Sequence, residues 1–132
     1  MSYQPQWDID LALGEAYERQ AAKTLGLASC KIEVKADCRY VETGNVFIEV
    51  AQLPRGAAQY KPSGIHVSEA DYWAFTAGSA ITMIPTQVIR EVVAAQKNAP
   101  IDGGLLGDNP TKGYALSLRG LITKTAQYGL SS

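Results

Sequence analysis

Two different spacings of apolar residues mark the first third of the chain. Between residues 8 and 25, apolar side chains recur every four positions and Gly26 follows as a stop signal, so this segment is predicted to be an amphipathic helix. Residues 31–38 alternate strictly between charged and apolar side chains, which predicts a half-buried strand. The charged face of that strand carries Lys31, Glu33, Lys35 and Asp37.

Shorter apolar runs predict the remaining elements. Residues 46–51 are nearly all apolar and follow a turn signal at 41–45, so we expect a second strand that forms a hairpin with the first. Ser68 is expected to cap a helix, and Pro85 with Thr86 to open another. The other predicted segments are a loop at 54–64, strands at 72–76, 80–84 and 114–118, a Gly-rich loop at 98–113 and a terminal helix at 121–128. This order predicts an α/β fold, a single domain over residues 1–132 with a central mixed β-sheet flanked by helices.

Composition narrows the class of protein. Hydrophobic residues make up 46% of the 132 positions and charged residues 19%, which fits a globular chain and excludes a disordered one. No run of about 18 apolar residues is present, so we expect no membrane span. The net charge of −1 argues against a protein that coats nucleic acid non-specifically, but it permits one local basic patch. Cys30 and Cys38 would lie about 26 Å apart along a strand, too far for a disulfide, and no secretory signal is visible, so we expect a cytoplasmic protein with reduced thiols.

One carboxylate stands out because of its apolar surroundings. Glu49 lies within the run 46–51, where an unpaired charge would be costly to bury. If the hairpin turn centres on Thr43, Asp37 faces Glu49 at about 4.5–5.5 Å between Cβ atoms, and Lys35 faces Ala51. Two like charges at that distance require a shared proton or a bound cation, and oxygen ligands suit Mg²⁺ or Mn²⁺. Two carboxylates, a divalent ion and a nearby ammonium are the groups that phosphodiester hydrolysis requires.

Six blocks of the sequence also carry a family resemblance. They are Lys35-Ala-Asp37, Thr43-Gly-Asn45, Phe47-Ile-Glu49, Lys61-Pro-Ser-Gly-Ile65, Glu69-Ala-Asp71-Tyr-Trp73 and the Gly-rich stretch from Gly103 to Asn109. Together these blocks resemble small, mostly phage-borne proteins of the PD-(D/E)xK nuclease superfamily, over residues 8–122. That superfamily includes Holliday-junction resolvases, phage endonuclease I and restriction endonucleases. The resemblance therefore implies a restriction-endonuclease-like fold and Mg²⁺-dependent cleavage of DNA, with branched DNA among the expected substrates.

The resemblance also implies roles for individual residues. Asp37 and Glu49 match the metal-binding carboxylates, which the carbonyl group of Val50 would assist, and Glu18 (or Glu15) matches a carboxylate on the first helix. The chain departs from the superfamily pattern at Ala51, where a lysine is usual. We expect Lys35 to supply the missing ammonium, because the hairpin register places it opposite that small side chain.

Other residues and alternatives remain open at this stage. Arg55, Tyr60 and Lys61 are candidate nucleic-acid contacts, the cations for phosphates and the ring for stacking on a base, although an ordinary polar loop would look the same. A catalytically silent relative that binds nucleic acid or a protein is the alternative to an enzyme. A structural domain with a solvated charged strand face is a third. The oligomeric state is open, a homodimer included.

Overall fold

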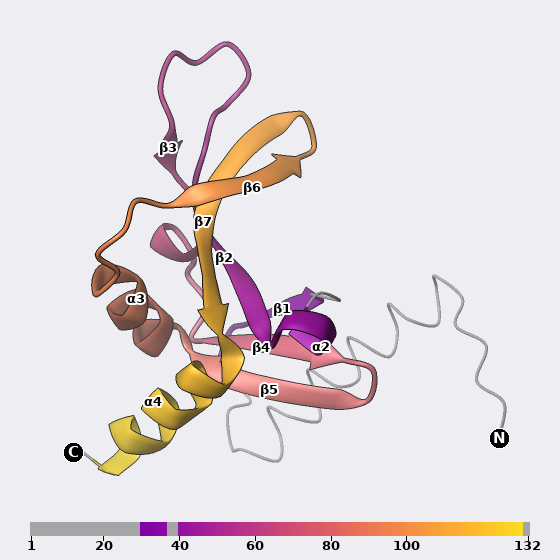
Figure 1. The fold of residues 1–132 in the computed structure, drawn as a ribbon, viewed down its shortest axis with the longest axis vertical. Coiled ribbons are helices and arrows are strands. Elements are labelled where there is room, and N and C mark those ends of the chain that lie inside the picture. Colours follow the sequence, from indigo (N-terminus) through magenta and orange to yellow (C-terminus); the bar gives the residue numbers. More distant parts are fainter. Residues whose placement is uncertain (1–29, 37–39, 131–132) are drawn as a thin grey trace, which may run out of the picture.

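The described strands form two sheets in place of the expected single one (Figure 1). The computed structural model describes residues 30–36 and 40–130. Its three-stranded sheet has the order β1-β4-β5, in which β1 (Ile32–Ala36) runs parallel to β4 (Tyr72–Ala77) and β4 runs antiparallel to β5 (Ala80–Pro85). The two short strands expected on either side of Gly78 are thereby confirmed.

The second sheet is antiparallel and has the order β3-β2-β7-β6. Its strands are β2 (Asn45–Gln52), β3 (Lys61–Pro62), β6 (Ile101–Leu106) and β7 (Asn109–Ser117). The prediction of a Gly-rich loop at 98–113 is therefore wrong, because most of this segment forms the β6–β7 hairpin. Gly107, at φ +61°, supplies the left-handed backbone of its turn.

Helices flank these sheets, which confirms the α/β class. Helix α3 (Thr86–Ala94) begins where Pro85 and Thr86 predict it, and its apolar stripe of Val88, Ile89 and Val93 is buried. Helix α4 (Leu118–Leu130) follows β7 directly, and α3 and α4 lie side by side (Figure 1). The described residues also form two short helical segments, α2 (Tyr40–Thr43) and the 3₁₀ turn η1 (Gly64–His66).

The expected hairpin between residues 31–38 and 46–51 is wrong. Strand β1 pairs with β4, and β2 pairs with β3 and β7, so the two segments belong to different sheets. A helical turn, α2, occupies the place of the expected tight turn, and the Gly44 amide donates to the Tyr40 carbonyl group at its end. Lys35 therefore pairs with Phe75 and not with Ala51.

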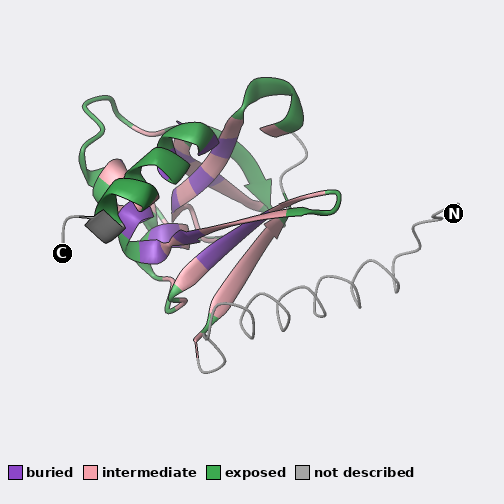
Figure 2. Ribbon diagram, turned by 90° about the horizontal axis from the view of Figure 1, so that it is seen from below, coloured by how far each residue is buried: buried purple, intermediate pink, exposed green. Residues whose placement is uncertain are grey.

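The hydrophobic core lies where the helices meet both sheets (Figure 2). Each described element except β1, α2, β3 and β6 contributes buried apolar side chains, with Ile48 from β2, Ile65 from η1 and Trp73 from β4 almost wholly enclosed. Among the described residues, no helix is both long and apolar enough to cross a bilayer.

Candidate functional site

Glu49 is intermediate in exposure, and its carboxylate has no partner among the described residues. On β2 it alternates with the buried side chains of Ile48 and Val50, so it lies on the face of the strand that points away from the core. No hydrogen bond or ion pair to its side chain is present within residues 30–36 and 40–130. Because no described side chain or amide binds them, the two carboxylate oxygens are available to a ligand.

The Lys61–Ile65 block packs directly on the backbone of Glu49. The Ser63 amide donates to the Val50 carbonyl oxygen at 3.0 Å, which continues the β2–β3 pairing. Gly64 follows with φ +56°, and a Cβ atom at this position would collide with the Glu49 carbonyl oxygen and lie 2.8 Å from Glu49 Cβ. The blocks Phe47–Glu49 and Lys61–Ile65, which both carry the family resemblance, are therefore in contact at the backbone of Glu49.

The other edge of β2 is equally close-packed. Glu49 pairs with Gly113 of β7, and a Cβ atom at Gly113 would lie 2.7 Å from Cζ of the Phe47 ring. The same ring lies against Gly103 of β6, where a Cβ would also collide with it. Phe47 and Glu49 share one face of β2 because they are two residues apart. The glycines of the β6–β7 hairpin therefore make room for the aromatic ring beside the carboxylate.

A lysine does lie opposite Ala51, but it comes from β7. A bulge at Val50 shifts the register, so that Ala51 pairs with Lys112. Lys112 and Gly113 are adjacent on their strand and point to opposite faces, which places Lys112 on the face opposite Glu49. Lys112 Nζ lies 4.5 Å from the centroid of the Tyr60 ring. Sequence reasoning missed Lys112 because the residue falls in the segment that looked like a loop.

The three predicted nucleic-acid contacts lie on or beside one protruding loop. The segment between β2 and β3 extends away from the three-stranded sheet (Figure 1). Arg55 is exposed on it, Tyr60 is half-buried at its end, and Lys61 is exposed at the start of β3. Arg55, Tyr60 and Lys61 of this segment, together with Lys112 of β7 against the Tyr60 ring, place three cations and one aromatic ring at the same end of the second sheet.

Lys35 has a different environment from the one predicted. Its Nζ lies 2.7 Å from Glu33 Oε2 and 4.7 Å from the centroid of the Trp73 ring. The side chains of Lys35 and Glu33 are 42% and 35% exposed, so the pair is partly shielded from water. The assignment of Lys35 to the metal site loses its geometric basis, because that assignment depended on the β1–β2 hairpin.

Ser68 caps a turn before a strand, and not the helix that was expected. Its Oγ accepts hydrogen bonds from the Ala70 amide and from Trp73 Nε1–H, and donates to Glu33 Oε1 at 3.0 Å. Arg90 of α3 donates to the carbonyl oxygens of Ser68 and of Ile65 in η1, at 2.6 and 3.0 Å. This network links β1, β4 and α3 to the turn that packs on Glu49.

Several predicted site residues lie outside the described residues. These are Asp37, Glu18 and Glu15, together with the helix expected at 8–25. Within the described ranges no three His, Cys, Asp or Glu side chains gather as a metal site. Val50 offers a carbonyl oxygen that already accepts the Ser63 amide, which leaves one lone pair for another donor or a cation.

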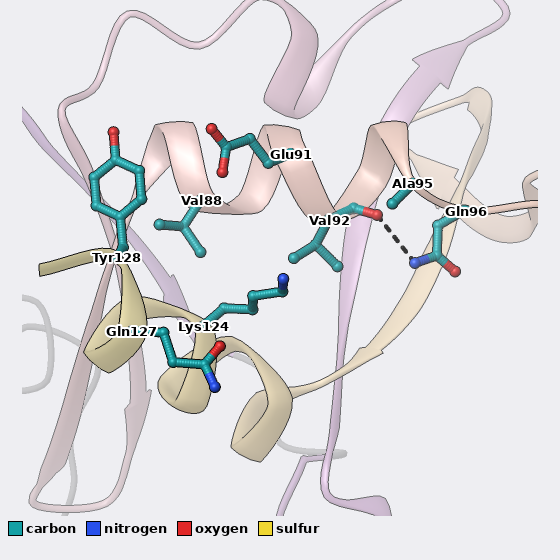
Figure 3. A pocket seen from close by; sticks show the side chains of 8 residues that line it. All are labelled: Val88, Glu91, Val92, Ala95, Gln96, Lys124, Gln127 and Tyr128. Carbon is teal, nitrogen blue, oxygen red and sulfur yellow. Dashed lines mark hydrogen bonds between the residues drawn. The ribbon is translucent and has the colours of Figure 1, made fainter. Parts of the chain in front are cut away.

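A groove of about 300 Å³ lies between α3 and α4 (Figure 3). Val88 and Val92 give the groove apolar walls. Glu91 adds a negative charge, Lys124 a positive charge and Tyr128 a hydroxyl group. Sequence reasoning did not find this groove, since the two helices are separated by the whole β6–β7 hairpin. It contains none of the predicted site residues.

Comparisons with protein-family models, with curated proteins and with solved structures find no match. The functional interpretation consequently rests on the geometry of the residues described above.

Proposed function

We propose that this protein is a metal-dependent DNA endonuclease. The observation that carries the proposal is the carboxylate of Glu49, which has no partner among the described residues, on a backbone held between Gly64 and Gly113 and next to a loop that holds Arg55, Tyr60 and Lys61. A fixed anion next to a local group of cations fits a site that takes a phosphodiester together with a divalent cation.

The donor atoms present fit Mg²⁺ or Mn²⁺. Such ions bind through one or two carboxylates and keep several waters, so Glu49 with Asp37, and the remaining lone pair of the Val50 carbonyl oxygen, would suffice. When bound, the ion supplies an activated water and neutralises charge on the phosphate. The superfamily resemblance adds Glu18 as a supporting carboxylate in this proposal.

The chain's own cations would bind and orient the DNA. Lys61 and Arg55 are exposed and would contact phosphates, which positions the duplex or branch without reading its sequence. Lys112, on the face of the sheet opposite Glu49, contacts the Tyr60 ring, so the ring is oriented before a base stacks on it. Branched DNA is the preferred substrate in this proposal, since its unpaired or distorted bases are accessible to such a ring.

The test is cleavage by Glu49→Gln, which keeps the shape of the side chain and removes its charge. We expect the variant to fold and to lose Mn²⁺- and Mg²⁺-dependent cleavage of branched and duplex DNA. Glu91→Gln, an exposed carboxylate in the α3–α4 groove, is the matched control and should cut normally. Wild-type rates for Glu49→Gln would overturn the assignment of the site.

A second candidate function is nucleic-acid binding without cleavage. It is favoured by the alanine at position 51, where the resemblance expects a lysine, and by the engagement of Lys35 with Glu33 and Trp73. Titration with Mn²⁺ separates the candidates: the enzyme requires binding that Glu49→Gln weakens, whereas the silent relative binds DNA equally well with and without the metal.

A further inference from the structure

Strand β6 forms one edge of the second sheet. Within the described part of the chain it pairs with β7 only, and all six of its residues are exposed. The large apolar side chains among them are Ile101, Leu105 and Leu106, which are 55%, 69% and 57% exposed. An edge with these properties carries unpaired amide and carbonyl groups together with apolar surface, the features that favour pairing with another strand.

The opposite edge of the same sheet is protected. Strand β3 has only two residues, Lys61 and Pro62. Proline has no amide hydrogen, and a lysine on an edge opposes close approach of another strand. Strand β6 has neither residue type within its bounds. The sheet can therefore extend at β6 and not at β3.

A bulge in β6 makes the strand complementary to itself. The register with β7 shifts between Asp102 and Leu105, so one extra residue lies in this interval. Ile101 pairs with Gly113 and Leu106 pairs with Asn109. Because these two β7 residues are four apart, Ile101 and Leu106 lie on one face of the sheet. Asp102 and Leu105 lie on the other, opposite Lys112 and Pro110. Without the bulge, residues five apart would point to opposite faces.

We propose that β6 pairs antiparallel with β6 of a second copy of this chain, about a two-fold axis between Gly103 and Gly104. In this register Ile101 lies opposite Leu106 of the second copy, and Asp102 lies opposite Leu105 of the second copy, so every directly opposed pair shares a face. Because of the bulge, Asp102 and Leu105 are separated by the rise of only two residues, so the two Asp102 residues lie about 8 Å apart, close to the Debye length at physiological salt, which weakens their repulsion. The paired copies form one continuous eight-stranded antiparallel sheet.

A second copy fits this edge better than an unrelated segment because both halves of the strand are matched. The only charge on the edge meets an apolar residue and not its own copy, and the bulky side chains at the two ends meet each other. Gly103 and Gly104 lie at the axis and bring no side chains to it. The interface does not involve Glu49, so this inference stands independently of the proposed endonuclease.

The first experiment measures self-association by sedimentation equilibrium of the full chain. We expect a concentration-dependent dimer whose dissociation constant rises at least tenfold in Leu105→Asp, since the register places the new carboxylate directly opposite Asp102 of the second copy. Val67→Asp is the control, because Val67 is 58% exposed and lies outside β6. A wild type that stays monomeric at every concentration, or equal weakening by both variants, would overturn the proposal.

The second experiment tests the register by crosslinking and does not depend on weakening the dimer. In a background with Cys30→Ser and Cys38→Ser, the double variant Ile101→Cys with Leu106→Cys should form a disulfide-linked dimer under mild oxidation. Each single variant should stay uncrosslinked, because equivalent positions in the two copies lie about 14 Å apart, beyond the reach of a disulfide. Equal crosslinking by a single variant would exclude this register and the two-fold axis with it.

Discussion

The contact between Gly64 and Glu49 permits a stability experiment with an internal control. Gly64 and Gly78 have nearly the same backbone, at φ +56° and +57°, and alanine at either position would carry left-handed strain of about 1–2 kcal/mol. A Cβ at Gly78 meets nothing within 4 Å, whereas a Cβ at Gly64 collides with the Glu49 backbone. Forcing an extra carbon into a packed site costs about 1–3 kcal/mol more. Gly64→Ala should therefore destabilise the fold by about 2–5 kcal/mol, and Gly78→Ala by about 1–2 kcal/mol.

Urea unfolding at 25 °C measures both values, and an unchanged slope against urea would show that the unfolded states are comparable. Because the Gly64 side of the turn fixes Glu49, we also expect Gly64→Ala to lose metal-dependent cleavage under conditions where the protein is still folded. Equal destabilisation by the two variants would refute the reasoning, since it would show that η1 accommodates the added carbon at no extra cost in free energy.

Three further predictions follow from other contacts. Lys35→Ala should lower the free energy of unfolding by about 1 kcal/mol, because it removes the ion pair with Glu33 and the contact with the Trp73 ring. Lys31→Ala should change it by almost nothing, because the ion pair between Lys31 and Glu69 is exposed. Thermal unfolding of the two variants measures the difference. Ser68→Ala should cost about 1–3 kcal/mol in urea unfolding, since it leaves part-buried donors without an acceptor; a neutral result would contradict the network. Lys61→Ala should reduce the slope of log affinity for DNA against log salt concentration by about one unit. Lys97→Ala, at an exposed lysine outside the loop, is the control and should leave this slope unchanged.

Local pattern predicted the elements whose neighbours in space are also neighbours in sequence. The β4–β5 pair follows from two apolar runs separated by Gly78, and α3 follows from Pro85, Thr86 and a regular apolar stripe. In both cases the spacing of residues and the local turn chemistry suffice to determine the structure.

The elements that failed depend on partners far along the chain. The charged face of β1 contacts Trp73 and Ser68, some 40 residues away, so no pairing with β2 is needed to satisfy it. The glycines of β6 and β7 resemble a loop locally, but Gly103 and Gly113 are required by the Phe47 ring. At the candidate site, the sequence identified Glu49 and the loop cations, while the bulge at Val50 and the position of Lys112 depend on strand register.

The central position of β4 has a consequence for the order in which the three-stranded sheet forms. Strands β4 and β5 are joined by a tight turn, whereas β1 reaches β4 across 40 residues, as the bond from the Lys31 amide to Asp71 shows. Closing the longer loop costs about 2 kcal/mol more in chain entropy. The β4–β5 hairpin should therefore assemble first and β1 dock onto it late in folding. In native-state hydrogen exchange, the amides of β1 should open well before those of β4, so that the strand carrying Glu33 and Lys35 detaches while the rest of the sheet stays intact.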